Sequence, residues 1–263
     1  MKIHLIILLF CLSFKGISHA RTILISDIDD TLKISHILDK VAAVENSVHL
    51  ENQFYGMSQL FNSLQSPQGI QFFYVSNALT YIHFLHADFL SQHQFPNGPL
   101  VLRENYFDKE HKFRSISKIL LKIRPSVVLL IGDNGERDPE IYARIQKNFP
   151  KIQIISFIHQ LYSVRSSIEV GKPILPGQLA YVTSVDLASY FRKLNLLSKK
   201  SYDDLVQTMV PEVINQRNDL YFGELAFPVW MDCQDFVRSN LDLTSDLLKA
   251  YSEMIKNRCS SNY

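Results

Sequence analysis

The stretch Thr22-Ile23-Leu24-Ile25-Ser26-Asp27-Ile28-Asp29-Asp30-Thr31 joins a short apolar run to a cluster of acids. Such a run is typical of a buried parallel strand, and acids directly after it are expected at the edge where open α/β sheets bind ligands. Asp27 and Asp29 begin on the same side of the strand, and two carboxylates so close repel one another unless a cation neutralises them. Oxygen ligands favour Mg²⁺. Acids also form ordinary turns and helix caps, so this stretch alone leaves both interpretations open.

Apolar runs of strand length recur along the chain and alternate with segments that have helical spacing. The expected strands cover residues 22–25, 70–75, 100–102, 127–131 and 152–155. The expected helices lie at residues 54–64, 81–95, 109–122 and after Asp138. This alternation predicts βαβ units and a central parallel sheet. Residues 32–48 show no strong period and are expected to form a loop and flap over the site.

Three of these strands are followed by polar residues, which are Asp27 and Asp29, Ser76 and Asn77, and Asp133 with Asp138. The carboxyl ends of parallel strands meet at one edge of a sheet, so we expect these side chains to converge. Asp138 also precedes Pro139 as an N-cap would, because proline suits the first helical position. Asp138 could therefore serve only the helix or take part in the site.

Residues 1–20 have the features of a secretory signal peptide. Lys2 gives a positive start, residues 3–14 are apolar but too short to cross a bilayer, and Ser18 and Ala20 supply small residues at −3 and −1. We expect cleavage after Ala20 and a secreted or periplasmic protein. An uncleaved anchor is the alternative.

Without residues 1–20 the chain is close to neutral. Their removal takes Lys2 and Lys15 from 27 basic side chains and none of the 26 acidic ones, which leaves a net charge of −1. No overall basic field is available, so no nucleic-acid partner is expected. Cys233 and Cys259 remain, and in an exported protein they could form one disulfide that fixes the carboxyl-terminal tail, or stay as two free thiols.

The composition changes after residue 159. The expected division is a signal peptide over residues 1–20, a core domain over 21–160 and a mostly helical region over 161–263. In the last region Thr183 fits the N-cap of a helix over residues 184–194, and further helices are expected at 203–213 and 244–256. Between these helices lie Phe222, Phe227, Trp230 and Phe236, which suit core packing better than contact with a lipid or substrate.

Together the polar clusters resemble the four motifs of haloacid dehalogenase superfamily phosphohydrolases. In chain order the motifs are Asp27-Ile28-Asp29-Asp30-Thr31, Ser76, Lys112, and Gly132-Asp133 with Asp138. Lys112 is preferred over Lys109 because it follows a histidine at the start of a helix. The resemblance implies a haloacid-dehalogenase-like three-layer α/β sandwich with a central parallel sheet. The intervals at residues 31–70 and 77–112 hold only core elements, so no large cap domain is expected.

Within this superfamily the chain is most similar to the actin-patch-associated phosphatidate phosphatases and their bacterial relatives. The similarity runs from about Thr22 to Ile158 and rests on residues 26–33, 73–77, 96–103 and 132–142. One departure is Ala78-Leu79, where the family tends to have Ser-Pro. This departure could alter the substrate edge of the second motif without touching the reaction centre.

The resemblance implies a Mg²⁺-dependent phosphatase that works through an aspartyl-phosphate intermediate. Asp27 would be the nucleophile, and Asp29 would act as general acid and then as general base. Ser76, Asn77 and Lys112 would bind the substrate, with Ser76 and Lys112 holding phosphoryl oxygens.

The resemblance also implies the metal ligands. Mg²⁺ would be held by Asp27, Asp133 and Asp29, the last through its backbone carbonyl. Asp138 would join them as a ligand, or would orient metal-bound water or Lys112. Residues 30–31 are expected to shape the turn.

An open site without a large cap suits bulky substrates, including head groups at a membrane surface. The resemblance implies phosphatidate or a related phosphomonoester as the substrate, which agrees with such a site, and a general acid phosphatase or nucleotidase acting on soluble phosphomonoesters is the alternative. A different class would be a non-catalytic module that binds a phospholipid or a partner, but such a module has no need of a nucleophile and acid pair.

Overall fold

The computed structural model describes residues 21–217, 219–237 and 245–260, except for the side chains of residues 65–68 and 260. Residues 1–20, on which the signal-peptide prediction rests, lie outside the described residues. Within the described ranges, no helix combines the length and the apolar character that crossing a membrane requires.

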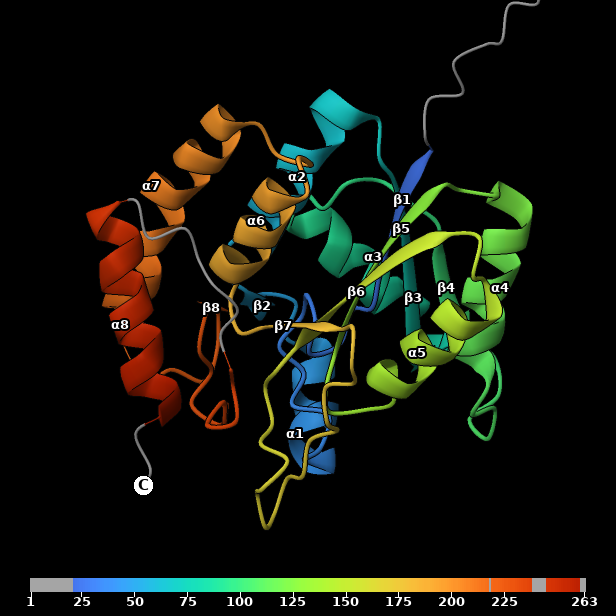
Figure 1. The fold of residues 1–263 in the computed structure, drawn as a ribbon. Helices are drawn as coiled ribbons and strands as arrows, with labels where there is room; N and C mark the ends of the chain where they lie inside the picture. The colour runs from blue at the N-terminus through green and yellow to red at the C-terminus, as the bar shows by residue number, and fades with distance from the viewer. Residues whose placement is uncertain (1–20, 218, 238–244, 261–263) are drawn as a thin grey trace, which may run out of the picture.

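A six-stranded parallel sheet forms the centre of the molecule (Figure 1), with the strand order β4-β3-β1-β5-β6-β7. The strands are β1 (Thr22–Ser26), β3 (Gln71–Leu79), β4 (Leu100–Arg103), β5 (Val127–Asp133), β6 (Gln153–His159) and β7 (Leu179–Tyr181). The first five agree with the expected strands, and the α/β fold with a central parallel sheet is confirmed. The sixth strand, β7, was not predicted because three residues are too few to show a period.

Helices cover both faces of this sheet (Figure 1). One face carries α2 (Met57–Gln68), α3 (His83–Gln92) with the preceding short 3₁₀ helix η1 (Thr80–Ile82), and α6 (Ser184–Lys193). The other face carries α4 (His111–Ile123) and α5 (Asp138–Asn148). Beyond α6 lie α7 (Lys199–Asn215) and α8 (Asp246–Ser260). These layers make up the expected three-layer sandwich.

Alternation along the strands divides the core into two parts. In β1, Leu24 belongs to the cluster that includes Leu60 of α2, whereas Ile23 belongs to the cluster that includes Ile116 of α4 and Ile141 of α5. Successive side chains of a strand point to opposite faces, so both faces of the sheet are apolar. Each fully buried Leu or Ile contributes about 1.5–3 kcal/mol. The carboxyl ends of the strands are thus held by apolar packing on both sides.

No large cap domain interrupts the described core. Between β1 and β3 lie only α1 (Lys40–Val48), β2 (Gln53–Phe54) and α2. Asp39 caps α1 by accepting hydrogen bonds from the amides of the first turn. The sequence did not predict α1, because the helix buries only Asn46 and leaves its apolar residues Val41, Val44 and Val48 exposed. It therefore lacks the usual amphipathic pattern.

The carboxyl-terminal region is mostly helical, as expected, and is joined to the core by strands. β7 extends the main sheet, and β8 (Glu224–Leu225) pairs with β2. Thr183 caps α6, because its hydroxyl accepts a hydrogen bond from the Val185 amide at 3.2 Å. Cys233 and Cys259 form a disulfide across 26 positions of sequence, so they are not the two free thiols of the alternative prediction.

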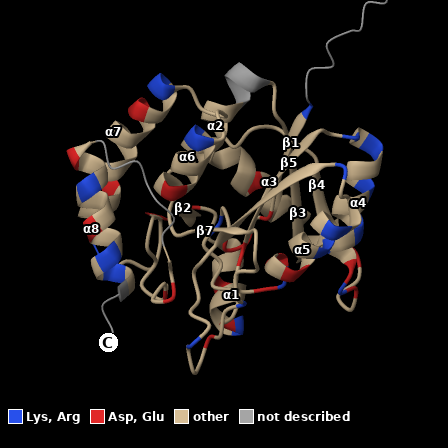
Figure 2. Ribbon diagram, viewed as in Figure 1, with Lys and Arg blue, Asp and Glu red and all other residues tan. Residues whose placement is uncertain are grey.

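Charges on the carboxyl-terminal helices are mixed. Figure 2 shows basic and acidic residues interspersed along α7 and α8. On α7, Lys199 pairs with Asp203 and Lys200 with Asp204, each at 2.6 Å. Exposed pairs of this kind contribute little to stability.

Candidate active site

Five of the seven predicted site residues line a cavity of about 190 Å³ at the carboxyl edge of the sheet, namely Asp27, Asp29, Ser76, Asn77 and Asp133. The other two, Lys112 and Asp138, are buried and are not part of its lining. Asp27 directly follows β1, Ser76 lies within β3, and Asp133 is the last residue of β5. The amide of Asp27 donates to the carbonyl of Ile131 at 2.8 Å, so the pairing of β1 with β5 continues into the site. Lys40, Ala43 and Ser47 of α1 form a further wall of the cavity.

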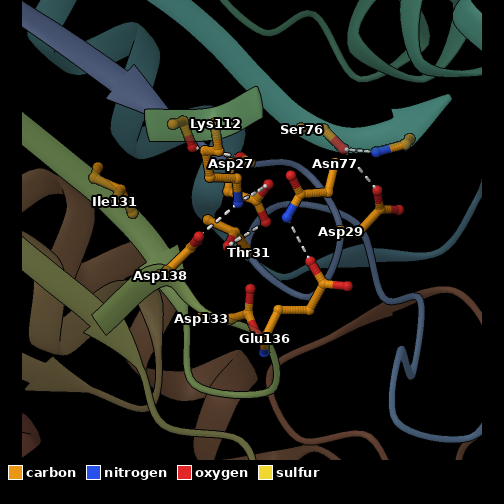
Figure 3. A network of polar contacts seen from close by, with 12 residues as sticks. Asp27, Asp29, Thr31, Ser76, Asn77, Lys112, Ile131, Asp133, Glu136 and Asp138 are labelled. Carbon is orange, nitrogen blue, oxygen red and sulfur yellow. Dashed lines mark hydrogen bonds and ion pairs between the residues drawn. The ribbon is translucent and has the colours of Figure 1, made fainter. Parts of the chain in front are cut away.

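Lys112 on α4 contacts two acids from different elements, Asp27 after β1 and Asp138 in α5 (Figure 3). Its Nζ donates to Oδ1 of Asp27 at 2.8 Å and to Oδ1 of Asp138 at 2.6 Å. All three side chains are almost completely buried. Burial alone lowers the pKa of Lys112, but Asp138 and Asp27 outweigh it and hold that pKa above its usual value. Lys112 is therefore a charged ammonium group within the site.

Asp27, Asp133 and Asp138 form an acidic cluster whose oxygens all lie within 4.8 Å of one another. Burial is the main cause that raises the pKa of Asp27 to about 8, and it raises the pKa of Asp133 well above its usual value. One ammonium group serves three buried carboxyl groups, so full ionisation of the cluster would leave more negative charge than the protein neutralises, and the raised pKa values reflect this. A divalent cation with oxygen ligands fits this deficit.

The hydrogen bonds indicate which carboxylates are best placed to bind such a cation. Asp27 Oδ2 accepts only the side-chain hydroxyl of Thr31, at 3.2 Å, among the described contacts. Oδ1 of Asp133 accepts the amide of Gly135 at 2.6 Å, which leaves Oδ2 for a cation. The structure thus places Thr31 against the expected nucleophile, where it fixes one carboxylate oxygen.

The main partner of Asp138 is Lys112, which donates to Oδ1 at 2.6 Å. The single hydroxyl hydrogen of Tyr142 is shared between Oδ2 of Asp138 at 3.3 Å and the closer carbonyl of Ile131 at 2.9 Å. The predicted role of Asp138 as a helix N-cap is wrong, because Arg137 is the N-cap and Asp138 is the first residue of α5. A Cβ at Gly132 would come within 2.1 Å of Asp138 Oδ2, so the close approach requires glycine there. Asp138 is therefore better suited to orient Lys112 than to bind a cation.

The carboxylate of Asp29 turns away from the acidic cluster (Figure 3). Its Oδ1 accepts from Ser35 Oγ at 2.7 Å, and its Oδ2 accepts from Ser76 Oγ at 3.1 Å and contacts Nε2 of His86 at 3.0 Å. Burial would raise the pKa of Asp29, but the charge and hydrogen bond of His86 together with Ser35 hold it below its usual value. Ser35 and His86 were not predicted as site residues.

Asp30 has a structural role. Its Oδ1 accepts from the amides of Ser35 and His36 at 2.8 and 2.7 Å, and its Oδ2 accepts from the amide of Ile37 at 2.9 Å. The hydroxyl of Tyr162 donates to the same Oδ2 at 2.5 Å. Asp30 therefore fixes the loop that carries Ser35 and leads into α1.

The end of β3 is linked to the loop after β5. The side-chain amide of Asn77 donates to Glu136 Oε2 at 2.8 Å, across the mouth of the cavity (Figure 3). The backbone amide of Ala78 donates to Ser76 Oγ at 2.9 Å. The departure from the family pattern at Ala78 thus leaves a backbone contact that orients Ser76.

The carboxyl-terminal region supports a loop beside the site and does not line the cavity. Trp230 stacks on the ring of His36, with centroids 4.3 Å apart and planes at 2°. His36 Nε2 also contacts Glu169 at 2.9 Å. All residues that line the cavity lie between Asp27 and Glu136. The helices after β7 therefore leave the site open.

A family model described as "Phosphatidate phosphatase APP1, catalytic domain" matches residues 22–160, more than half of the chain. The chain belongs to this family. One member, phosphatidate phosphatase APP1 of Saccharomyces cerevisiae, is 29% identical over 140 residues. That match covers 48% of this chain and 24% of the S. cerevisiae protein, so the chain corresponds to about a quarter of its relative's length.

Members of the phosphatidate phosphatase family are phosphatase domains, and the resemblance predicted from the four motifs is confirmed. Two solved structures are more distant. The Pnkp1/Rnl/Hen1 complex has a TM-score of 0.38 and 12% identity, covering 54% of this chain and 47% of the other. A class C acid phosphatase from Bacillus anthracis with tungstate bound has a TM-score of 0.36 and 14% identity, covering 72% and 78%. Neither likeness is close enough to assign a function.

Proposed function

We propose that this protein is a Mg²⁺-dependent phosphomonoester phosphatase with Asp27 as its nucleophile. The observation that carries the proposal is the buried arrangement of Asp27 between Lys112 and Asp133, with a second carboxylate, Asp29, beside the same cavity. A module that only binds phosphate would gain from Lys112. It would gain nothing from a nucleophile and a separate acid.

The reaction has two displacement steps. The negative charge of a bound phosphoryl group raises the pKa of Asp29, which is low in the free protein, so that Asp29 can carry a proton in the complex. Asp27 attacks phosphorus, the bond from phosphorus to the ester oxygen breaks, and protonated Asp29 gives its proton to that oxygen. Water then attacks phosphorus in the aspartyl-phosphate, gives a proton to Asp29, and the bond to Asp27 breaks. Phosphate leaves, and Asp29 is again protonated for the next substrate.

Lys112 and Ser76 would hold phosphoryl oxygens. Lys112 is fixed by Asp138, so its ammonium group remains beside Asp27 when the phosphoryl group arrives. Ser76 donates to Asp29 in the structure and would turn toward a phosphoryl oxygen instead. Loss of one such contact lowers the rate by about 10²–10³.

Asp27, Asp133 and the backbone carbonyl of Asp29 would hold Mg²⁺. The excess of buried carboxylates over ammonium groups supports a cation at this position. When bound, Mg²⁺ offsets the repulsion between an anionic nucleophile and an anionic phosphoryl group. Asp138, which was among the expected ligands, is assigned instead to the orientation of Lys112, because its shortest contact is with that ammonium group at 2.6 Å.

Phosphatidate or a related lipid phosphomonoester is the proposed substrate. The name of the family and of the S. cerevisiae relative supports this class. A cavity of about 190 Å³ suits a phosphorylated head group and leaves the acyl chains outside. The helix α1, which lines that cavity through Lys40, Ala43 and Ser47, also exposes three valines to solvent, and these could contact a lipid surface. The alternative is a phosphatase acting on soluble phosphomonoesters.

We further propose that residues 1–20 direct export, so that the mature protein acts in the periplasm or outside the cell. The disulfide between Cys233 and Cys259 supports an oxidising compartment. Export can be tested by sequencing the amino terminus of the protein from an expressing cell. A mature chain that begins at Arg21 would support cleavage after Ala20.

The decisive experiment compares phosphate release by the purified protein from phosphatidate vesicles, glycerol phosphate and nucleotides, with Mg²⁺ and with a chelator. We expect release that requires Mg²⁺ and is fastest with phosphatidate. Asp27→Asn should abolish it, whereas Asp88→Asn, an exposed change on α3, should not. Near-normal turnover by Asp27→Asn would disprove the nucleophile assignment, and faster turnover of nucleotides would favour the soluble-substrate alternative.

A further inference from the structure

His86 contacts Asp29 but lies outside every motif recognised in the sequence. His86 belongs to α3, 57 positions after Asp29, and its Nε2 lies 3.0 Å from Asp29 Oδ2. The His86 side chain is 3% exposed, whereas that of Asp29 is 24% exposed. Both side chains line the cavity, but the carboxylate is the more exposed of the two and the imidazole is almost completely buried.

The burial of His86 is not explained by a hydrogen-bonding network. Its other ring nitrogen, Nδ1, is buried without a hydrogen bond of normal geometry, although the backbone of Ile82, one turn earlier, interacts with the ring. A buried polar atom without a partner costs about 1–3 kcal/mol, and an apolar side chain at this position would avoid that cost. Asp29 is the ion-pair partner of this imidazole. Its position is thus better explained by what it does to Asp29 than by core packing.

Ser76 makes the contact with His86 more important during the reaction. In the structure Oδ2 of Asp29 is shared by Ser76 and His86. Under the proposed function Ser76 turns to a phosphoryl oxygen when substrate binds, and its hydrogen bond to Asp29 is lost. His86 then remains as the side chain that fixes this oxygen, while Ser35 fixes the other.

We propose that His86 is a positioning residue that holds the Asp29 carboxyl group toward the leaving oxygen of the substrate. The inference rests on the proposed function, because it assumes that Asp29 transfers a proton to that oxygen. His86 itself gains and loses no proton in this role. It limits the rotation of Asp29 about its side-chain bonds, which matters only in steps where Asp29 transfers a proton.

This role predicts a dependence on the leaving group. An alkoxide, as released from glycerol phosphate or phosphatidate, is a poor leaving group and must be protonated as its bond to phosphorus breaks. A nitrophenolate is stable without that proton. A loose Asp29 should therefore slow hydrolysis of alkyl phosphates much more than hydrolysis of p-nitrophenyl phosphate. A defect of folding or of phosphate binding would slow both substrates alike.

The experiment compares glycerol phosphate with p-nitrophenyl phosphate for the wild type, His86→Leu and His86→Gln. For His86→Leu we expect kcat on glycerol phosphate to fall roughly 10- to 100-fold, part of the 10²–10⁴ that proton transfer supplies, with a much smaller fall on p-nitrophenyl phosphate. The amide of His86→Gln can donate from a position similar to Nε2 and should restore most of the loss. The matched control is His83→Leu, one turn earlier on α3 and exposed, which should leave both rates unchanged.

Both rates are measured on one sample, so their ratio does not depend on the fraction of the variant that folds. An unchanged ratio for His86→Leu would overturn the inference, as would equal defects in His86→Leu and His86→Gln. If the wild type hydrolyses neither substrate and also releases no phosphate from phosphatidate vesicles, the proposed function fails as well. If it hydrolyses both and only the ratio stays constant, the role of His86 alone is disproved.

Discussion

The ammonium group of Lys112 lies 2.8 Å from Oδ1 of Asp27, and both side chains are almost completely removed from solvent. A buried pair of this kind gives the nucleophile a fixed orientation. It also leaves the acidic cluster dependent on one cation from the protein.

Lys112→Met should therefore impair both activity and stability. The change leaves Asp27 and Asp138 without their common donor, and breaking a buried pair costs about 3–5 kcal/mol. Phosphate release should fall by about 10²–10³ through the lost phosphoryl contact. Urea unfolding and phosphate release measure the two effects, with Lys118→Met, exposed on the same helix, as the control. Unchanged unfolding would contradict the importance of the pair.

Asp138→Asn should affect the rate more than substrate binding. Lys112 would lose the shorter of its two contacts with carboxylates, at 2.6 Å, and with it part of its orientation. We expect kcat to fall by roughly 10- to 100-fold, as for other groups that orient a ligand, with little change in KM. Steady-state kinetics with Glu140→Gln as an exposed control on α5 measures this difference. A rise in KM at constant kcat would instead indicate that Asp138 contacts substrate.

Mg²⁺ binding should release protons at neutral pH. Burial raises the pKa of Asp27 to about 8 in the metal-free protein, so Asp27 retains a proton at pH 7 that a cation must displace. Affinity should increase as the pH rises through about 8. The stability of the metal-free protein should change in the opposite direction. The folded protein binds the proton of Asp27 more tightly than the unfolded chain does, so the stabilisation that this proton provides is lost as the pH rises through about 8.

Calorimetric titrations of Mg²⁺ at pH 7 in two buffers with different ionisation enthalpies measure the proton release. The apparent binding enthalpy should differ between the buffers. For Asp27→Asn the difference should shrink, because the amide has no proton to release. Identical enthalpies for the wild type in both buffers would contradict the raised pKa.

Removal of the disulfide should lower stability without changing the reaction. A cross-link over this length of chain contributes about 3.5 kcal/mol by the loop-closure relation, since Cys233 and Cys259 are 26 positions apart. The variant with both cysteines changed to serine should melt roughly 10 °C lower. Calorimetry measures the shift. Added reductant should destabilise the wild type in the same way and leave the double variant unchanged, and phosphate release at low temperature should persist.

The sequence predicted the parts of the fold that depend on local pattern. The runs that became β1, β3, β4, β5 and β6 are apolar enough to be recognised alone, and each is followed by a turn or a polar cluster. The acids and Lys112 could be placed together because parallel strands bring their ends to one edge. α1 and β7 were missed, since one exposes its apolar residues and the other is very short.

The remaining site residues could not be found from local pattern because their roles depend on long-range contacts. His86 contacts Asp29 from α3, although the two residues are 57 positions apart in the sequence. A single histidine within a helix gives no indication of such a contact. Trp230 reaches His36 from a region that was assigned to general packing. The two roles of Asp138 were indistinguishable until Arg137 was seen to cap α5.

The strand β7 has a consequence for anyone who works with a shortened form of this protein. The family match ends at residue 160, one residue after β6, but β7 occupies the outer side of β6 through Phe157, Ile158 and His159. A fragment cut at that point would present a bare row of amide and carbonyl groups beside an uncovered apolar face. Exposed strand edges of this kind pair with the edges of further copies. Insolubility of that fragment would therefore result from the loss of β7 and would not show that the core domain is unable to fold.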